Sequence, residues 1–496
     1  MPQIAQSMRT ITFDNVRVWD TGEIISVIVP GTDDARLLDE AGPFPDGDVV
    51  VDGTGYTIAP GFADPHVHFR DPGQTYKESM LSGCQAAASG GYTHVLVMPN
   101  TLPAMDGERV TDDQVRRGDP GAAEVIGAGS DNVIDYLQRY ESIHDVSLPC
   151  RYDLCVCASR GRAGRRASDP DRWIPYMGDA HAEGRLRHPI TAISDDGAAV
   201  TEPTLQAVLD NARRTGLYLI EHCEHHETGC MNEGETSRRL KVPGIPPETE
   251  LAVVARDIAA ARRTGVHIHF QHVSTAASFD AIRKAKSEGL PITCETAPHY
   301  MALCDEDILE YGPMAKMNPP LRSSADRRAT IEAVADGTVD LLATDHAPHT
   351  MSEKTTDLLH APNGIIGLEC AYGVCHRILV DGGHISERRL IELMSLAPAR
   401  LMGYQCANIA SMISPRGGRD GAGVMDLRGI PRSDATDFTL LSTGEEWTVR
   451  PELFHSHARN TPFGGWKVTG RTLATILGSR LVFSRIPSTR IKERHN

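Results

Sequence analysis

The feature that most constrains the fold of this 496-residue chain is an alternation of apolar strands with helix-like segments in its middle part. Eight candidate strands end at residues 66–68, 95–98, 154–157, 192–194, 218–221, 268–271, 292–294 and 341–343. Most are separated by a stretch with helical spacing of apolar residues, and several of these stretches stop at a glycine, such as Gly216 or Gly265. Eight β/α units predict an α/β fold, a closed parallel (β/α)8 barrel of the TIM type, with its active site at the carboxyl ends of the strands.

Both ends of the chain have a different pattern. Short β-like segments separated by Gly, Pro and Asp turns occupy residues 11–29 and 49–51, and similar segments return at 438–441, 447–449 and 481–483. We expect residues 1–60 and 405–496 to pair into one small β-sandwich domain around a barrel of residues 61–404. The glycine-rich run 414–424 is expected to be an exposed loop, and the arginine-containing run 160–166 a solvated one.

Composition excludes several classes of protein. The chain has 50 basic and 66 acidic residues, and a net charge of −16 disfavours nucleic acid and anionic membranes as partners. No apolar run is long enough to span a membrane, and the first nine residues lack the apolar core of a signal peptide. The 11 scattered cysteines do not suggest a disulfide scaffold, so we expect a cytoplasmic protein. An anionic small substrate would need only a local basic site.

Potential metal ligands follow one expected strand after another. His66 and His68 are two residues apart on one strand and so face the same side. The later strands end in Asp195-Asp196, His222, His272 and Asp345. Each residue alone could be a helix cap, a turn residue or a hydrogen-bonded histidine. Together, four imidazoles and two carboxylates suit two zinc-type ions that share a hydroxide, with one carboxylate left to carry protons. That chemistry is hydrolysis, or its reverse, at an activated carbonyl.

Several motifs resemble those of the dihydroorotase family within the amidohydrolase superfamily. They lie, in the family's order, at residues 61–73, 77–78, 98–101, 194–197, 272–275, 318–322, 345–349, 364–369 and 460–463. The resemblance covers nearly the whole chain and implies a barrel with a β-sandwich built from both termini. It also implies reversible cyclisation of N-carbamoyl-L-aspartate to L-dihydroorotate, a step of de novo pyrimidine (UMP) biosynthesis, by a metal-activated bridging hydroxide.

The resemblance also implies roles for particular residues. One or two Zn²⁺ ions per chain are expected, with two favoured: His66 and His68 would hold one ion, and His222 and His272 the other. Asp195 would bridge them, with Asp196 as the alternative, and Asp345 would bind the first ion and act as general base and acid. The residues expected at the substrate are His68, Arg70, Asn100, Asn318, His349, Asn363 and Gly364. Asn363 stands where the family more usually has an apolar residue.

Two other functions compete with this interpretation. The first is another cyclic amide hydrolase, such as an allantoinase or a hydantoinase, many of which bridge their metals with a carbamylated lysine at the end of strand four. No lysine occurs between Lys77 and Lys241, so strand four has none to modify. The second is a non-catalytic scaffold of aspartate carbamoyltransferase, which would be expected to have lost its metal ligands. A homo-oligomer, and a complex with aspartate carbamoyltransferase, are further expectations.

Overall fold

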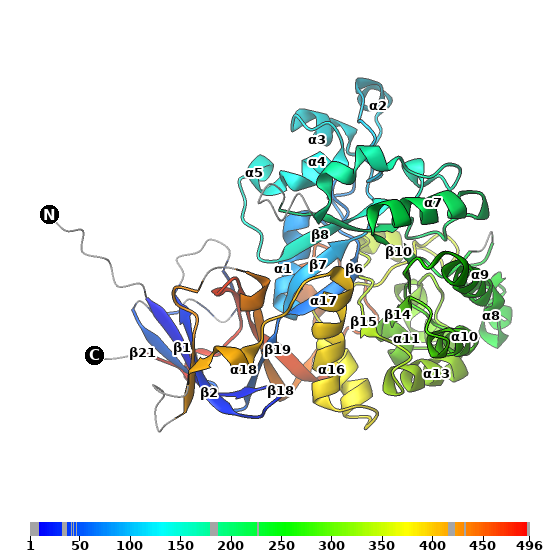
Figure 1. The fold of residues 1–496 in the computed structure, drawn as a ribbon. Helices are drawn as coiled ribbons and strands as arrows, with labels where there is room; N and C mark the ends of the chain where they lie inside the picture. Colours follow the sequence, from blue (N-terminus) through cyan, green and yellow to red (C-terminus); the bar gives the residue numbers. More distant parts are fainter. Residues whose placement is uncertain are drawn as a thin grey trace.

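The structure is a computed structural model that describes residues 9–31, 37–40, 42, 44–45, 47–178, 187–225, 228–414, 422–430 and 433–493. Its centre is a parallel sheet of eight strands that follow one another in chain order (Figure 1). These strands are β6 (Phe62–Val67), β7 (Tyr92–Val97), β8 (Arg151–Cys157), β9 (Ile190–Ser194), β10 (Tyr218–Glu221), β13 (Ile268–Phe270), β14 (Ile292–Thr296) and β15 (Leu341–Leu342). A parallel bridge between Val67 and His346 joins the two ends of the sheet. The predicted (β/α)8 barrel is therefore confirmed, strand by strand.

Helices cover the outside of the barrel. They include α1 (Met80–Gly90), α7 (Glu202–Thr215), α9 (Glu248–Thr264), α10 (Ala276–Ser287), α13 (Ser324–Ala335), α16 (Glu387–Met394) and α17 (Leu396–Met402). One apolar face of α7 is buried, and the helix ends, as expected, at Gly216, whose φ of 72° closes the last turn in the left-handed conformation. Each helix buries one apolar stripe against the strands, which are themselves buried on both faces.

The connections that follow β7 and β8 are long. The first carries the short helices α2 (Asp112–Arg117), α3 (Ala122–Gly127), α4 (Val133–Gln138) and α5 (Tyr140–His144), which extend from one side of the barrel in Figure 1. The second carries three 3₁₀ turns between Arg160 and Tyr176. Arg165 and Arg166 are exposed, as expected of a solvated loop, but Arg162 is half-buried.

Strands from both termini pair into one second sheet. It contains β1 (Thr10–Val18), β2 (Ile24–Pro30), β3 (Leu38–Asp39), β4 (Val49–Asp52), β5 (Tyr56–Pro60), β16 (Ile413–Ser414), β17 (Gly423–Asp426), β18 (Phe438–Thr448), β19 (Lys467–Leu477), β20 (Arg480–Ser484) and β21 (Ile491–Glu493). β5 pairs antiparallel with β18, and β2 pairs with β17. Phe13, Val27 and Phe438 belong to the apolar core of this sheet. The sheet and both described ends of the chain lie to one side of the barrel in Figure 1.

Two details of the terminal sheet differ from the sequence-based expectation. Within the range 11–29, where short segments are expected, residues 10–18 form the single strand β1, with a register shift between Phe13 and Val16. Of the run 414–424, residues 415–421 lie outside the described residues, whereas Ser414 and Gly423 belong to the paired strands β16 and β17. The domain division at residues 60/61 and 404/405 stays our proposal. Among the described residues, no helix has both the length and the apolar character needed to cross a membrane.

Candidate active site

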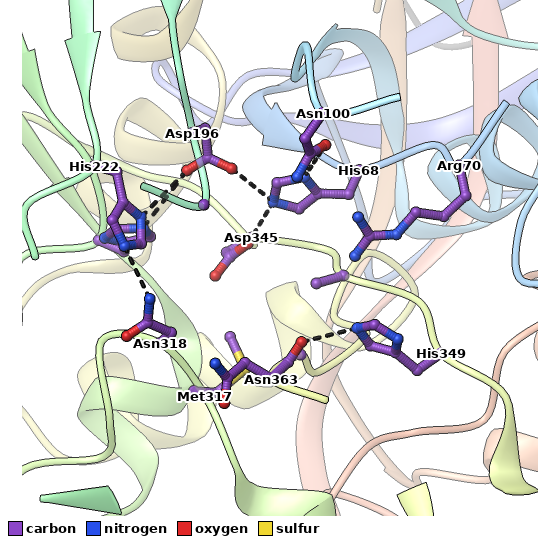
Figure 2. A pocket seen from close by; sticks show the side chains of 14 residues that line it. His68, Arg70, Asn100, Asp196, His222, Met317, Asn318, Asp345, His349 and Asn363 are labelled. Carbon is purple, nitrogen blue, oxygen red and sulfur yellow. Dashed lines mark hydrogen bonds and ion pairs between the residues drawn. The ribbon is translucent and has the colours of Figure 1, made fainter. Parts of the chain in front are cut away.

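A pocket of about 260 Å³ opens at the carboxyl ends of the barrel strands, where the sequence places the candidate site. Its lining comprises His68, Arg70, Asn100, Asp196, Gly197, His222, His272, Met317, Asn318, Asp345, Ala347, His349, Asn363 and Gly364 (Figure 2). Two expected residues do not line it: His66 lies deeper, fully buried beneath the pocket, and Asp195 points elsewhere. The pocket thus brings together residues that are up to 296 positions apart in the chain, from His68 to Gly364.

His66, His68 and Asp345 form the first group of potential metal ligands. His68 Nε2 lies 3.0 Å from Asp345 Oδ1, and His66 Nε2 lies 3.4 Å from the same oxygen. The other ring nitrogen of His68, Nδ1, donates to Asn100 Oδ1 at 2.9 Å, so Asn100 orients this ring. One ligand atom from each member of the group lies within 4.8 Å of those of the other two.

Asp196, and not Asp195, lies among the histidines. Asp196 Oδ2 lies 3.3 Å from His68 Nε2, and Asp196 Oδ1 lies 3.5 Å from both His66 Nε2 and His222 Nδ1. The Asp195 carboxylate instead accepts the backbone N–H and the hydroxyl of Ser159 on the neighbouring strand connection. This corrects the expectation for Asp195. Side chains alternate between the two faces along β9, so Asp196 points to the same side as Ala192, inside the barrel. Asp195 points to the same side as Ile193, in the layer packed against the helices.

His222 and His272 complete the cluster on the far side of Asp196. His272 Nε2 and His222 Nδ1 are 3.0 Å apart, and the amide nitrogen of Asn318 donates to His222 Nε2 at 3.0 Å. His66, Asp196 and His272 form a second group whose ligand atoms lie within 4.8 Å of one another. His272 and Asp345, two and three residues after the ends of β13 and β15, both have positive φ, 34° and 49°. Non-glycine residues in this conformation are strained, and such strain is typical of functional sites.

The cluster fits divalent metal ions. Several buried ligand atoms, among them His66 Nε2 and both Asp196 carboxylate oxygens, have no hydrogen-bond partner within the described part of the chain. Burial lowers the pKa of His66, but the carboxylates of Asp345, Asp196 and Glu295 outweigh it and hold that pKa well above its usual value. The cluster therefore favours positive charge at its centre, and imidazole with carboxylate is the ligand set of zinc-type ions.

Glu295 is a buried residue of the site that the sequence analysis missed. Its Oε1 accepts from His66 Nδ1 at 2.6 Å, and its Oε2 lies 3.0 Å from His269 Nε2. Despite burial, the charge of His66 and these hydrogen bonds lower the pKa of Glu295 to about 2, so it stays ionised. An ionised carboxylate only accepts, so His66 Nδ1 carries the proton and His66 Nε2 faces the cluster as a potential ligand. The signal in the sequence that could have identified Glu295 is a carboxylate near the end of the apolar strand β14.

The opposite side of the pocket carries one cationic lining residue, Arg70, and Lys77 lies behind His349, where it pairs with Glu353 at 2.8 Å. Arg70 Nε donates to the Pro348 carbonyl at 3.4 Å, and burial lowers the pKa of Arg70 to about 10, which leaves it charged at neutral pH. Lys77 Nζ lies 3.3 Å from His349 Nδ1. Because an ammonium group only donates, His349 Nδ1 accepts and Nε2 carries the proton, which it donates to the Asn363 carbonyl at 2.8 Å. Burial and the charges of Arg70 and Lys77 lower the pKa of His349 to about 2, so the ring is neutral.

Gly364 and Arg162 show how closely the backbone encloses this pocket. A Cβ on Gly364 would lie 2.7 Å from the Ala347 carbonyl oxygen and 2.7 Å from His349 Cδ2, so only glycine fits there. Arg162, from the run expected to be solvated, donates to the carbonyl oxygens of Asp195 and Asp196. Its position holds the backbone that carries Asp196, a role that composition alone could not reveal.

Comparison with known proteins places this geometry in a family. Residues 57–133 and 172–408 match the model of the amidohydrolase family. The chain belongs to the amidohydrolase family. Curated relatives of this amidohydrolase include the dihydroorotase of Anaeromyxobacter dehalogenans, 38% identical over 87% of each chain. The dihydroorotase of Lactiplantibacillus plantarum is 35% identical over 96% of this chain and 99% of its own. That of Geobacter metallireducens is 35% identical over 89% of this chain and 91% of its own.

Solved structures of more distant proteins share the fold of this amidohydrolase. The L-hydantoinase of Arthrobacter aurescens aligns with a TM-score of 0.69 at 20% identity, covering 97% of each chain. The dihydropyrimidinase of Brevibacillus agri aligns with a TM-score of 0.67 at 20% identity, covering 96% of each chain. At this identity the likeness establishes the barrel with its second, terminal sheet, and the site must be judged from its own residues.

Proposed function

We propose that this amidohydrolase is a dihydroorotase that interconverts N-carbamoyl-L-aspartate and L-dihydroorotate at the pocket described above. The observation that carries the proposal is the juxtaposition, in one pocket, of a histidine–aspartate cluster with a cationic wall around Arg70. The cluster supplies the chemistry of amide hydrolysis, and the wall suits a substrate with a carboxylate beside its reacting amide. The 34–38% identity to curated dihydroorotases over most of the chain supports the same reaction.

The residues that would hold metal are those of the histidine–aspartate cluster. His66, His68 and Asp345 would hold one ion, and His222 and His272 the other, with Asp196 facing both. Zinc is the metal we propose, because imidazole nitrogen and carboxylate oxygen donors suit it. Bound divalent metal supplies a nucleophile at neutral pH by lowering the pKa of water to roughly 7.

The chain's own side chains would orient the substrate and move the proton. The Arg70 guanidinium can donate two parallel hydrogen bonds to the substrate carboxylate, a geometry that a planar fork favours. Asn318, the Asn363–Gly364 backbone and the His349 ring, whose Nε2–H is bonded to the Asn363 carbonyl, would complete the binding surface on the same side of the pocket. Asp345 lies beside His66 and His68 and would accept a proton in hydrolysis and return it to the leaving nitrogen. In cyclisation the same steps run in reverse.

The equilibrium of the reaction tests the proposed substrate pair. N-Carbamoyl-L-aspartate carries two carboxylates and dihydroorotate one, so ring closure consumes one proton near neutrality. By mass action, each unit decrease in pH should raise the equilibrium ratio of dihydroorotate to carbamoyl aspartate about tenfold. The ratio is measured by separating the two compounds after equilibration with the enzyme between pH 6 and 8. A ratio that does not change with pH would mean that the substrate pair is wrong.

The competing cyclic amides provide a second comparison in the same assay. A hydantoinase or allantoinase would act on rings without a carboxylate at the position that faces Arg70. We therefore expect dihydroorotate to be hydrolysed far faster than hydantoin or allantoin, and Arg70→Lys to reduce that preference. Faster turnover of hydantoin than of dihydroorotate would favour the competing function.

Assembly and location remain proposals. We propose that the protein acts in the cytoplasm, which suits its eleven free cysteines, ten of them buried. A homo-oligomer and a complex with aspartate carbamoyltransferase stay predictions, which light scattering of the purified protein, alone and mixed with that enzyme, would check. A purely scaffolding role would require that the cluster bind no metal and that dihydroorotate not be hydrolysed.

A further inference from the structure

Lys354 is a buried lysine beside the pocket to which the proposed chemistry assigns no role. It ends the short helix α14 (Met351–Lys354), which begins two residues after His349, and only 1% of its surface is exposed. Its ammonium donates to three carbonyl oxygens: those of Gly364 at 2.9 Å, Pro362 at 3.0 Å and Lys316 at 3.3 Å. An ammonium group has three donors, so each finds one acceptor.

The three carbonyl groups belong to two segments that form one wall of the pocket. Lys316 directly precedes Met317 and Asn318, and Pro362 and Gly364 flank Asn363. Figure 2 shows Asn318, Met317 and Asn363 along the same side of the pocket. The Gly364 N–H also donates to the Lys316 carbonyl at 3.0 Å, so the two segments touch directly where the ammonium joins them.

Side chains, and not a regular hydrogen-bond ladder, define the path of this wall. Residues 361–364 form no helix or strand. The Asn363 carbonyl accepts from His349, and the Gly364 carbonyl accepts from the Asn460 amide at 3.0 Å as well as from Lys354. Lys316 Nζ binds the carbonyl oxygen of Ala361 at 2.7 Å. Without these donors the segment would have few bonds to fix its backbone.

A buried ammonium group in this position is unfavourable for folding. This argues that Lys354 serves to hold the backbone in place and not to stabilise the fold. Burial and the neighbouring charge of Lys316 lower the pKa of Lys354 to about 7. Its three hydrogen bonds all go to neutral carbonyl groups, which offset only part of the desolvation of a buried charge. An apolar side chain of similar length would avoid that desolvation, but it could not hold three carbonyl groups in place.

We propose that Lys354 is a positioning residue for substrate binding: its ammonium fixes the backbone around Met317–Asn318 and Asn363–Gly364, and thereby the wall that meets the substrate. The inference rests on the proposed placement of substrate against this wall. Lys354 touches neither the proposed metal ligands nor the reacting atoms, so its loss should weaken binding and leave the chemical step intact.

The substitution Lys354→Met keeps the length of the side chain and removes its donors. We expect KM for N-carbamoyl-L-aspartate to rise about tenfold or more, because hydrogen bonds from a charged group are lost, while kcat stays within about threefold and zinc content is unchanged. Lys286→Met is the matched control. Lys286 also donates to a carbonyl group, that of Thr338 at 2.7 Å, and pairs with Asp340 at 2.5 Å, but at the other end of the barrel. The KM of Lys286→Met should therefore match that of the unmodified enzyme.

Arg70→Lys in the same assay separates a failure of this inference from a failure of the proposed site. If Arg70→Lys raises KM and Lys354→Met does not, Lys354 has no positioning role and the proposed function stands. If neither raises KM, the placement of substrate is wrong. A fall in kcat or in zinc content at unchanged KM would also overturn the inference. Should Lys354→Met fail to fold, Lys354→Gln, which keeps an amide donor, is measured against the same criteria.

Discussion

Asp345 is the residue on which the proposed proton transfer depends. It lies 3.0 Å from His68 Nε2 and has φ of 49°, a conformation that asparagine also tolerates. Asp345→Asn should therefore keep the backbone and remove the base, with a loss of about 10² to 10⁴ in kcat. Zinc content must be measured in the same samples, because part of the loss could come from weaker metal binding. A variant with the unmodified rate would refute the assignment.

Glu295 should act through metal binding. Its carboxylate fixes His66 with Nε2 facing the cluster, and outer partners of this kind typically contribute about 10- to 100-fold to metal affinity. We predict that Glu295→Gln weakens zinc binding by about that factor, measured by competition with a chromophoric chelator. The His376 ring, which is buried and lies 3.3 Å from the Asp381 carboxylate, offers a control: His376→Gln should leave zinc affinity unchanged. Equal affinity in both variants would contradict the role of Glu295.

At the residue scale, the structure gathers eleven of the twelve expected site residues in or directly beneath the pocket, and their roles stay predictions. The motifs at the strand ends made this possible. The choice between Asp195 and Asp196 was wrong because it depended on which face of β9 turns inward, and two adjacent aspartates offer no internal signal for that. Glu295, Arg162 and Lys354 act through neighbouring groups, and such contacts join positions far apart in the chain.

At the scale of elements, the barrel strands were easier to predict than the terminal ones. Barrel strands are buried on both faces and read as continuous apolar runs. β19 (Lys467–Leu477) alternates charged, small and apolar residues and was missed, and β3, β16 and β21 are too short to leave a pattern. The short strands β3 and β21 pair with strands from the opposite end of the chain, β20 and β4, so their own residues do not determine the pairing.

The short strand β3 depends on an ion pair that can be tested with acid. Glu40, directly after β3, accepts from Arg485 at 3.1 and 3.0 Å, and His455 lies 3.1 Å away. Burial raises the pKa of Glu40, but the hydrogen bond from His455 and the charge of Arg485 outweigh it and lower the pKa to about 2. The usual value is 4.5, so this stabilisation is present above about pH 4.5 and is lost as the pH falls towards 2.

Urea unfolding of Glu40→Gln should reveal this dependence. At pH 7 we expect a loss of about 1–2 kcal/mol, reduced from the full linkage value because the pair is partly solvated. The difference from the unmodified protein should shrink between pH 4.5 and 3. Asp113→Asn, which breaks an exposed pair with Arg116, should change stability by less than about 0.5 kcal/mol at either pH. A Glu40→Gln difference that grew on acidification would contradict the assigned pKa shift.

At the scale of the whole molecule, the barrel gathers ligands from five strand ends around one centre, while the terminal sheet packs beside it (Figure 1). The eightfold alternation was enough to predict that architecture, because a closed parallel barrel is the way such units bury both faces of their strands. The sequence could not predict which of the ligands share an ion, since that depends on side-chain directions at the rim.

The most direct test of the whole account is zinc content and dihydroorotate hydrolysis measured together in the unmodified protein, Asp196→Ala and Asp195→Ala. We predict up to two zinc ions per chain in the unmodified protein, loss of activity on chelation and its return with zinc alone, without bicarbonate. Asp196→Ala should lose metal and most activity, whereas Asp195→Ala, whose carboxylate binds Ser159, should keep both. Full activity after complete removal of metal, a requirement for bicarbonate, or loss of metal from Asp195→Ala but not from Asp196→Ala would contradict it.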